Sequence, residues 1–263
     1  NSGSGASNVL VGVSASINAN LSNATLIGNG VTSGGGGVVI VGQGATVGTG
    51  VNNTVIGQGS SLTTTGATMV LVGQGITGST ATNSVAMGQG VVMTAGVHST
   101  VVIGQGAEGT GSQDVIIGRF STAGTGTGNT IVGYNSNTTA GNTSSNTVIG
   151  ASASATGGSD TVIGASGATG TGGSNTVVGK SATTATGNTA SNVVVGASSS
   201  ATGGSCTVIG QNSAISGARS TSIGAGNTVT HTDVVAVGNA ITSTANGQVI
   251  FGSATTIFSD FWF

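Results

Sequence analysis

The chain has 263 residues, of which 52 are glycine, none is proline and 3% are charged. An ordinary soluble domain has about a quarter charged residues and about 7% glycine, so this composition excludes the usual surface of a globular enzyme. The net charge is −2 and no basic patch is present, so we expect no nucleic-acid partner. No apolar run approaches the roughly 18 residues of a membrane-spanning helix, so we expect no membrane insertion.

Residues 1–7 are expected to form an N-terminal lead-in, and residues 8–252 form a repeat region. In this region a glycine that follows an apolar residue, and in all but one case an apolar pair, recurs seventeen times, with a mean period of 15 and spacings of 14 to 17. The repeat glycines are Gly12, Gly28, Gly42, Gly57, Gly73, Gly88, Gly104, Gly118, Gly133, Gly150, Gly164, Gly179, Gly196, Gly210, Gly224, Gly238 and Gly252. A short fixed period of this kind is typical of solenoid architectures.

Each repeat glycine closes a predicted strand. The residue before it is always apolar, the residue two before is apolar except at Ser222, and the residue three before is Val or Thr. Enrichment in β-branched residues with glycine punctuation predicts a strand of four or five residues, then a turn and a weaker second strand. The same residues are poor helix formers. We therefore predict an all-β solenoid of about 17 short coils, stacked at about 4.8 Å.

Two adjacent apolar columns predict that both faces of the strand are covered, because successive side chains point to opposite faces. One face can fill the core of its own coil. The other would form a long exposed stripe, which monomers rarely tolerate, so we expect it to meet copies of itself around a symmetry axis. We assign this interface to the column two residues before glycine, and expect Val148→Asp to dissociate the assembly. The interface residues are Leu10, Leu26, Ile40, Val55, Leu71, Val102, Ile116, Ile131, Val148, Val162, Val177, Val194 and Val208.

Five glutamines occupy one column, directly after the repeat glycine in "GQG" turns. They are Gln43, Gln58, Gln74, Gln89 and Gln105. Stacked side-chain amides can form a hydrogen-bonded ladder, as in other stacked-strand assemblies. We predict such a polar ladder, with a glycan-contacting stripe as the alternative interpretation.

The sequence contains no catalytic, cofactor-binding or metal-binding constellation, and we predict no enzyme activity and no cofactor. The five acidic residues lack the spacing of paired acid–base groups. They are Glu108, Asp114, Asp160, Asp233 and Asp260. Asp114 and Asp160 fall in a column four residues before glycine that often holds Asn or Asp, where we expect turn-forming residues.

The remaining reactive residues also favour structural interpretations. His98 and His231 lie about nine repeats apart, and we expect both in solvent-facing loops. Gly179-Lys180-Ser181 lacks the upstream glycine of a phosphate-binding loop and lies within a repeat. Cys206 occupies the Asn/Asp column, where we interpret it as a substitution at a tolerant turn position.

The last residues, 253–263, depart from the repeat. Five of the seven aromatic residues follow position 250. Because a solenoid end exposes unpaired edges, this segment is expected to be an aromatic cap or the start of a further domain.

Two stretches resemble the Ser-Val-Ala-Ile-Gly repeat of YadA-like heads, namely Ser84-Val85-Ala86-Met87-Gly88 and Val234-Val235-Ala236-Val237-Gly238. Those heads belong to trimeric autotransporter adhesins, and similar modules occur in bacteriophage tail fibres. The resemblance implies a homotrimer of left-handed parallel β-rolls at a cell surface or on a virion tail fibre. It also implies a cell-surface glycan or protein receptor. The chain departs from the family pattern where Val or Ile replaces Ala and where Thr replaces Val.

The leading functional hypothesis is a non-enzymatic, extracellular, trimeric fibre segment that mediates attachment to a host or cell surface. A purely structural surface filament or spacer is the alternative. An ice-binding solenoid is a minor alternative, based on a threonine column that Val interrupts. The column contains Thr25, Thr54, Thr130, Thr147, Thr161, Thr176, Thr207 and Thr221.

Overall fold

The computed structural model describes residues 5–18, 20–63, 65, 67–94, 96–139, 145–184 and 191–253. The chain divides into two compact units, Asn1–Asn135 and Ser136–Phe263. Over the described ranges every regular element is a β-strand, and no helix is long and apolar enough to cross a membrane. The predicted all-β parallel β-solenoid is confirmed, with about 15 turns where the sequence predicted about 17.

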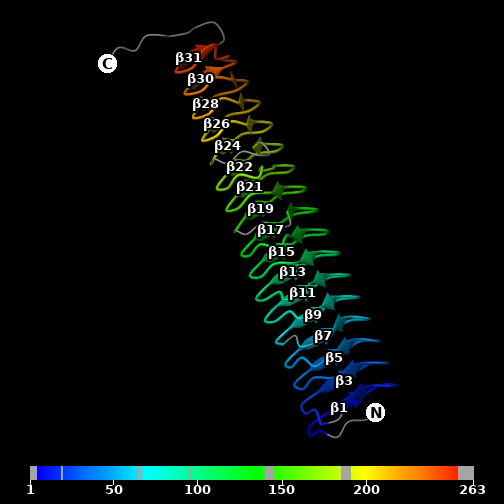
Figure 1. Cartoon of the computed structure of the whole chain (residues 1–263). Coiled ribbons are helices and arrows are strands. Elements are labelled where there is room, and N and C mark those ends of the chain that lie inside the picture. Colours follow the sequence, from blue (N-terminus) through cyan, green and yellow to red (C-terminus); the bar gives the residue numbers. More distant parts are fainter. Residues whose placement is uncertain are drawn as a thin grey trace. The chain divides into compact units, whose positions relative to one another are not determined.

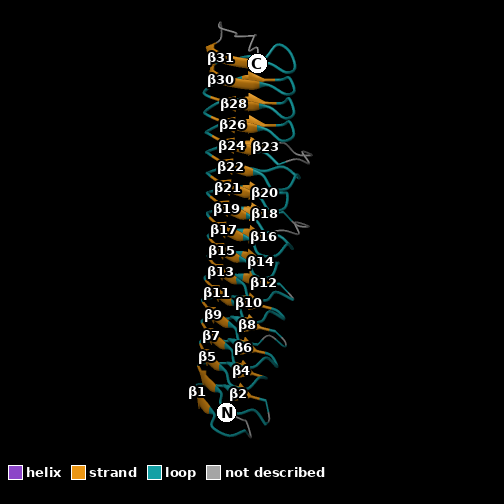
Figure 2. Ribbon diagram, turned by 90° about the vertical axis from the view of Figure 1, so that its left-hand side faces the viewer, coloured by secondary structure: helices purple, strands orange, loops and turns teal. Residues whose placement is uncertain are grey.

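The first unit alternates longer and shorter strands, and strands of each kind stack on their own kind (Figures 1 and 2). The longer strands are β1 (Val9–Val11), β3 (Thr25–Ile27), β5 (Val39–Val41), β7 (Thr54–Ile56), β9 (Val70–Val72), β11 (Val85–Met87), β13 (Val101–Ile103), β15 (Val115–Ile117) and β17 (Thr130–Val132). The shorter strands are β2 (Ser16–Ile17), β4 (Thr32–Ser33), β6 (Thr46–Val47), β8 (Ser61–Leu62), β10 (Thr77–Gly78), β12 (Val92–Met93), β14 (Glu108–Gly109) and β16 (Thr122–Ala123).

The second unit repeats this arrangement. Its longer strands are β19 (Thr147–Ile149), β21 (Thr161–Ile163), β22 (Thr176–Val178), β24 (Val193–Val195), β26 (Thr207–Ile209), β28 (Thr221–Ile223), β30 (Val235–Asn239) and β31 (Val249–Ser253). Its shorter strands are β18 (Asn137–Thr138), β20 (Ser154–Ala155), β23 (Thr183–Thr184), β25 (Ser200–Ala201), β27 (Ala214–Ile215) and β29 (Thr228–Val229). The expected C-terminal cap lies outside the described residues, apart from Ser253, which ends β31.

The register places equivalent residues of successive turns side by side. Ala86 of β11 pairs with Leu71 of β9 on one side and with Val102 of β13 on the other. Backbone hydrogen bonds run from each turn to the next, such as that from the N–H of Val85 to the carbonyl of Thr100 at 2.9 Å. Each sequence column therefore becomes a continuous row of side chains.

The repeat glycine is required by the distance between turns. At Gly57 φ is +139°, and a Cβ atom there would lie 1.7 Å from the carbonyl oxygen of Gly73 in the next turn. The same clash recurs between successive repeat glycines, such as Gly73 with Gly88. Only glycine combines this φ with so close an approach of two backbones.

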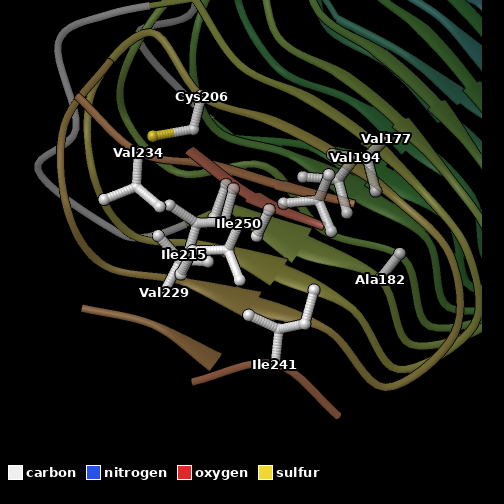
Figure 3. Close-up of a cluster of buried hydrophobic side chains, with 12 residues drawn as sticks. Val177, Ala182, Val194, Cys206, Ile215, Val229, Val234, Ile241 and Ile250 are labelled. Atoms are coloured by element: carbon white, nitrogen blue, oxygen red, sulfur yellow. The ribbon is translucent and has the colours of Figure 1, made fainter. Parts of the chain in front are cut away.

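The core of each unit is formed by the middle residue of each longer strand, by inward residues of the shorter strands and by residues just before the strands. Figure 3 shows such a cluster in the second unit, where Val177 and Val194 come from longer strands and Ile215 and Val229 from shorter ones. These side chains are at most 1% exposed. Fully burying one such side chain stabilises a protein by about 1.5–3 kcal/mol, so the stacked turns stabilise one another.

Candidate functional site

The longer strands of both units present an apolar outer face. We define the outer face as the first and third residues of each longer strand, which point away from the core. Ile27, Val39 and Ile56 in the first unit are 40%, 40% and 41% exposed. In the second unit Ile163 and Ile209 are 40% and 42% exposed. Val, Ile and Thr supply nearly all of this face, and parallel register aligns them in rows.

The predicted interface residues lie on the opposite side of these strands, which corrects the assignment made from the sequence. All but the first are fully buried in the solenoid core of their own chain: Leu26, Ile40, Val55, Leu71, Val102, Ile116, Ile131, Val148, Val162, Val177, Val194 and Val208. Leu10, in β1, is half-buried. A side chain enclosed by its own coil has no surface left for a second copy. Val148→Asp would therefore disrupt the core and would not test an interface.

The shorter strands present a different surface. Their outward residues are mostly Ser and Thr, and the hydroxyl of Thr46 donates to the hydroxyl of Ser61 in the next turn at 2.9 Å. Glu108 is also an outward residue of this surface, on β14. The apolar surface is therefore concentrated on the outer face.

The predicted glutamine ladder is present. Side-chain Nε2 of Gln58 donates to Oε1 of Gln43 at 3.1 Å, and Gln74 donates to Gln58 in the same way at 3.1 Å. Gln89 donates to Gln74 at 3.1 Å, and Gln105 donates to Gln89 at 2.9 Å. All five side chains lie on the surface, so the ladder is a continuous strip of amides running from turn to turn.

The ladder ends in a cation and two aromatic rings, at residues that were not among the predicted site residues. Nε of Arg119 donates to Oε1 of Gln105 at 2.8 Å. Its Cζ lies 4.4 Å from the ring centroid of Phe120 and 6.0 Å from that of Tyr134. The two rings meet edge-to-face, with centroids 6.4 Å apart. Arg119 and Tyr134 stand at the position directly after the repeat glycine, where the five preceding turns hold Gln. This change of residue type was the signal available in the sequence.

The Asn/Asp column forms a second ladder inside the solenoid. Oδ1 of Asn192 accepts the backbone N–H of Cys206 at 2.8 Å, and Oδ1 of Asp114 accepts the N–H of Asn129 at 2.7 Å. Asp114 and Asp160, which we expected to be turn-forming residues, are 0% and 1% exposed and belong to this buried ladder. The turn residues with positive φ come directly before them, at Gln113 and Ser159.

Burial changes the titration of both carboxyl groups. Desolvation raises the pKa of Asp114 and of Asp160 above the ordinary aspartate value, although hydrogen bonds from Asn129, Thr169 and Asn175 oppose the shift. Oδ2 of Asp114 is buried, and no group of the described residues donates a hydrogen bond to it. Two of the five acidic groups therefore lie at positions where burial favours the neutral form of the side chain over the charged form.

Cys206 is buried rather than placed at a tolerant turn, and its thiol donates to the carbonyl of Gly217 at 3.1 Å. Desolvation raises the pKa of this thiol, so the environment favours the unreactive protonated form.

The two histidines and Lys180 do not form a common site. His98 is exposed, as expected, and its Nδ1 lies 2.5 Å from the hydroxyl of Thr82. His231 is half-buried, with Nδ1 2.9 Å from the hydroxyl of Ser243. Lys180 lies exposed after a repeat glycine. Across the described ranges, no three His, Cys, Asp or Glu side chains gather closely enough to hold a metal ion.

No family model matches this sequence, and no curated protein is significantly similar to it.

Proposed function

We propose that this chain is a non-enzymatic, extracellular segment of a homotrimeric attachment fibre. In this proposal the coils are left-handed, and the outer face of each chain packs against the outer faces of two copies. The receptor is a cell-surface glycan or protein. The trimer, the handedness and the receptor class come from the resemblance of Ser84–Gly88 and Val234–Gly238 to YadA-like heads.

The observation that carries the proposal is the contrast between the two surfaces of each unit. Many Ile and Val side chains of the outer face are about 40% exposed, whereas Ser and Thr dominate the outward positions of the shorter strands. Large contiguous apolar surfaces on soluble proteins usually mark interaction sites. Because the outer face repeats from turn to turn, it can pack against the outer face of another copy. A closed symmetric assembly buries this face equally in every copy.

The test is the solution mass of the purified chain by light scattering. The proposal expects three times the chain mass of 24.4 kDa. The double variant Ile163→Asp/Ile209→Asp places charges on the outer face and should reduce the mass to that of the monomer. The matched control, Ser154→Asp/Ser200→Asp, adds the same charge on the shorter strands and should stay trimeric. A monomeric native chain contradicts the trimer, and open-ended particles favour the filament or spacer.

Attachment is tested separately, by binding of the native oligomer to intact cells and to immobilised glycans. Saturable binding supports a receptor-binding fibre. A stable trimer that binds neither cells nor any glycan or surface protein points instead to a spacer, because a spacer needs only length.

Ice binding is a second candidate function, and it uses the same outer face. Thr147, Thr161 and Thr176 stand side by side in successive turns, and each is two residues from an outward Ile or Val. Regular rows of hydroxyl and methyl groups could order water, but only if the face stays uncovered. Thermal hysteresis of a monomeric chain would favour this function, whereas a trimer that buries the face excludes it.

A further inference from the structure

The end of the glutamine ladder has features that the repeat does not require. The whole chain contains seven aromatic residues and three Lys or Arg residues. Arg119, Phe120 and Tyr134 bring two of the aromatic residues and one of the cations together on the surface of two successive turns. Equivalent positions of the five preceding turns, from Gln43-Gly44 to Gln105-Gly106, hold Gln followed by Gly.

Phe120 adopts a left-handed backbone conformation, which suits the glycines at the equivalent positions of the preceding turns better than it suits a bulky residue. Its φ is +57°, and the equivalent Gly90 and Gly106 have φ of +62° and +61°. A bulky side chain in this region is a genuine outlier, and such outliers concentrate at functional sites. The ring also restricts the preceding turn, because a Cβ on Gly106 would lie 2.7 Å from the ring atom Cδ1. Nothing in the stacking of the coil requires a ring at this corner.

Arg119 is held in place but keeps donors available. Its Nε is bonded to Gln105, which is itself fixed by its bond to Gln89. Among the described residues, the one ion pair is that between Arg219 and Asp233, so no carboxylate neutralises Arg119. No described group accepts a hydrogen bond from either Nη atom of Arg119. Two nitrogens of a fixed, exposed guanidinium are therefore free to bind an anion.

We propose that Arg119, Phe120 and Tyr134 form a binding site for a carboxylated sugar, such as a hexuronic acid unit of a surface polysaccharide. The guanidinium can bind the carboxylate through two parallel hydrogen bonds. Phe120 and Tyr134 are 43% and 51% exposed, which leaves ring surface for the apolar C–H face of the sugar. The amides of the ladder supply donors and acceptors for neighbouring hydroxyl groups.

The charge of the site separates this ligand from other anions. A nucleic acid is held chiefly by many phosphate contacts to Lys and Arg. This site has a single cation, Arg119, and the chain has a net charge of −2. A single guanidinium beside two rings matches a unit that carries one carboxylate and one apolar face. An acidic peptide has the carboxylate but lacks the broad C–H face of a pyranose ring.

This site deepens the proposed attachment function and rests on it for its biological role, since a trimer would present three copies. Each copy can be weak, because multivalent binding raises the overall affinity without new contacts. The binding itself requires only the first unit of one chain, so it can be measured whatever the oligomeric state.

The experiment is a titration of the full-length protein with a hexuronic acid tetrasaccharide, followed by NMR chemical shifts or calorimetry. Three ligands are compared: the tetrasaccharide, its carboxyl-reduced neutral form and an acidic tetrapeptide of equal charge. We expect the native protein to bind the acidic sugar about tenfold or more tightly than either alternative. Equal binding of the neutral sugar overturns the role of Arg119, and equal or tighter binding of the peptide overturns the sugar class.

The variants restore the residues of the preceding turns, so they should fold. Arg119→Gln extends the glutamine column, and Phe120→Gly restores the residue type of Gly106. We expect each to weaken binding of the acidic sugar by about tenfold. Arg219→Gln removes the other exposed arginine and should leave the affinity unchanged. Unchanged affinity in Arg119→Gln, or no binding by the native protein, overturns the site. Light scattering on the same samples reports the trimer independently, so the two proposals can fail separately.

Discussion

Asn175 donates both its backbone N–H and its side-chain amide to Oδ1 of Asp160, at 2.8 and 3.1 Å. A carboxylate thus occupies one step of a buried ladder whose neighbouring steps, Asn146 and Asn175, are amides. Asn175 also donates to the carbonyl of Gly172, three residues before it, at 2.9 Å. A carboxylate cannot make this donation, which is why the ladder favours Asn.

We expect Asp160→Asn to raise the free energy of unfolding at neutral pH. Burial raises the pKa of the folded carboxyl group, so its contribution to stability is fully present below the ordinary aspartate pKa, about 4. That contribution is lost as the pH rises through the folded pKa. Urea unfolding at a series of pH values should show a larger loss in the native protein than in the variant, which of the two raised carboxyl pKa values keeps only that of Asp114. Equal pH dependence of both proteins would contradict the prediction.

Asp233→Asn is the control, because its shift has the opposite sign. The hydrogen bonds from Arg219 lower the pKa of the exposed Asp233. Its contribution is present above the ordinary aspartate pKa and is lost as the pH falls through the folded value. This variant should therefore not gain stability at neutral pH.

Asp114→Asn should stabilise the first unit by about 1–3 kcal/mol, the range for removing an unsatisfied buried polar atom. The new Nδ2 can donate to the carbonyl of Gly111, as Asn175 does to Gly172. The measurement is the urea midpoint at constant m-value. Unchanged or lower stability would mean that the buried Oδ2 is compensated in solution.

Two glycines of one turn should respond differently to alanine. Gly57→Ala drives a Cβ to 1.7 Å from the carbonyl oxygen of Gly73, and we expect a loss above about 3 kcal/mol. At Gly59 nothing lies within 4 Å of a Cβ and φ is +62°. Gly59→Ala should lower the free energy of unfolding by only about 1–2 kcal/mol, the cost of placing a non-glycine residue in the left-handed conformation. Thermal unfolding of both variants measures the difference, and similar losses would refute the steric argument.

Gln74→Glu should destabilise the ladder modestly. Glutamate cannot donate to Oε1 of Gln58, so one exposed hydrogen bond is lost, at about 0.5–1.5 kcal/mol. Gln211 provides the matched control, since its column neighbours are Ala197 and Ala225, which have no side-chain amide. Gln211→Glu should leave the urea midpoint unchanged. An equal effect at both positions would indicate a general effect of charge.

Val148→Asp and Ile149→Asp should separate the core from the outer face. Val148 is 0% exposed and Ile149 is 38% exposed. A charge at Val148 is buried without a partner, so we expect a loss of several kcal/mol and of β-structure by circular dichroism. Ile149→Asp should keep the β-spectrum and change only the oligomeric mass. A folded Val148→Asp protein would contradict the inward orientation.

The sequence alone determined the repeat, the strand class and the glutamine ladder, because each depends on local spacing. The repeat glycines predict where the longer strands end, and Gln43 to Gln105 fall in one column that parallel stacking turns into a hydrogen-bonded row. Two-residue alternation also showed that Val148 and Ile149 point to opposite faces. It could not show which face is inside, since both columns are apolar.

Only the tertiary structure decided that question, because the way in which the chain closes each coil selects the enclosed face. Closure puts Val148 in the core and leaves Ile149 outside, and it buries Asp114 and Asp160 in a ladder where turn residues were expected. It also brings Arg119, Phe120 and Tyr134 together, since Tyr134 is one turn away along the chain. Contacts between successive turns depend on three-dimensional closure, which local residue preferences do not encode.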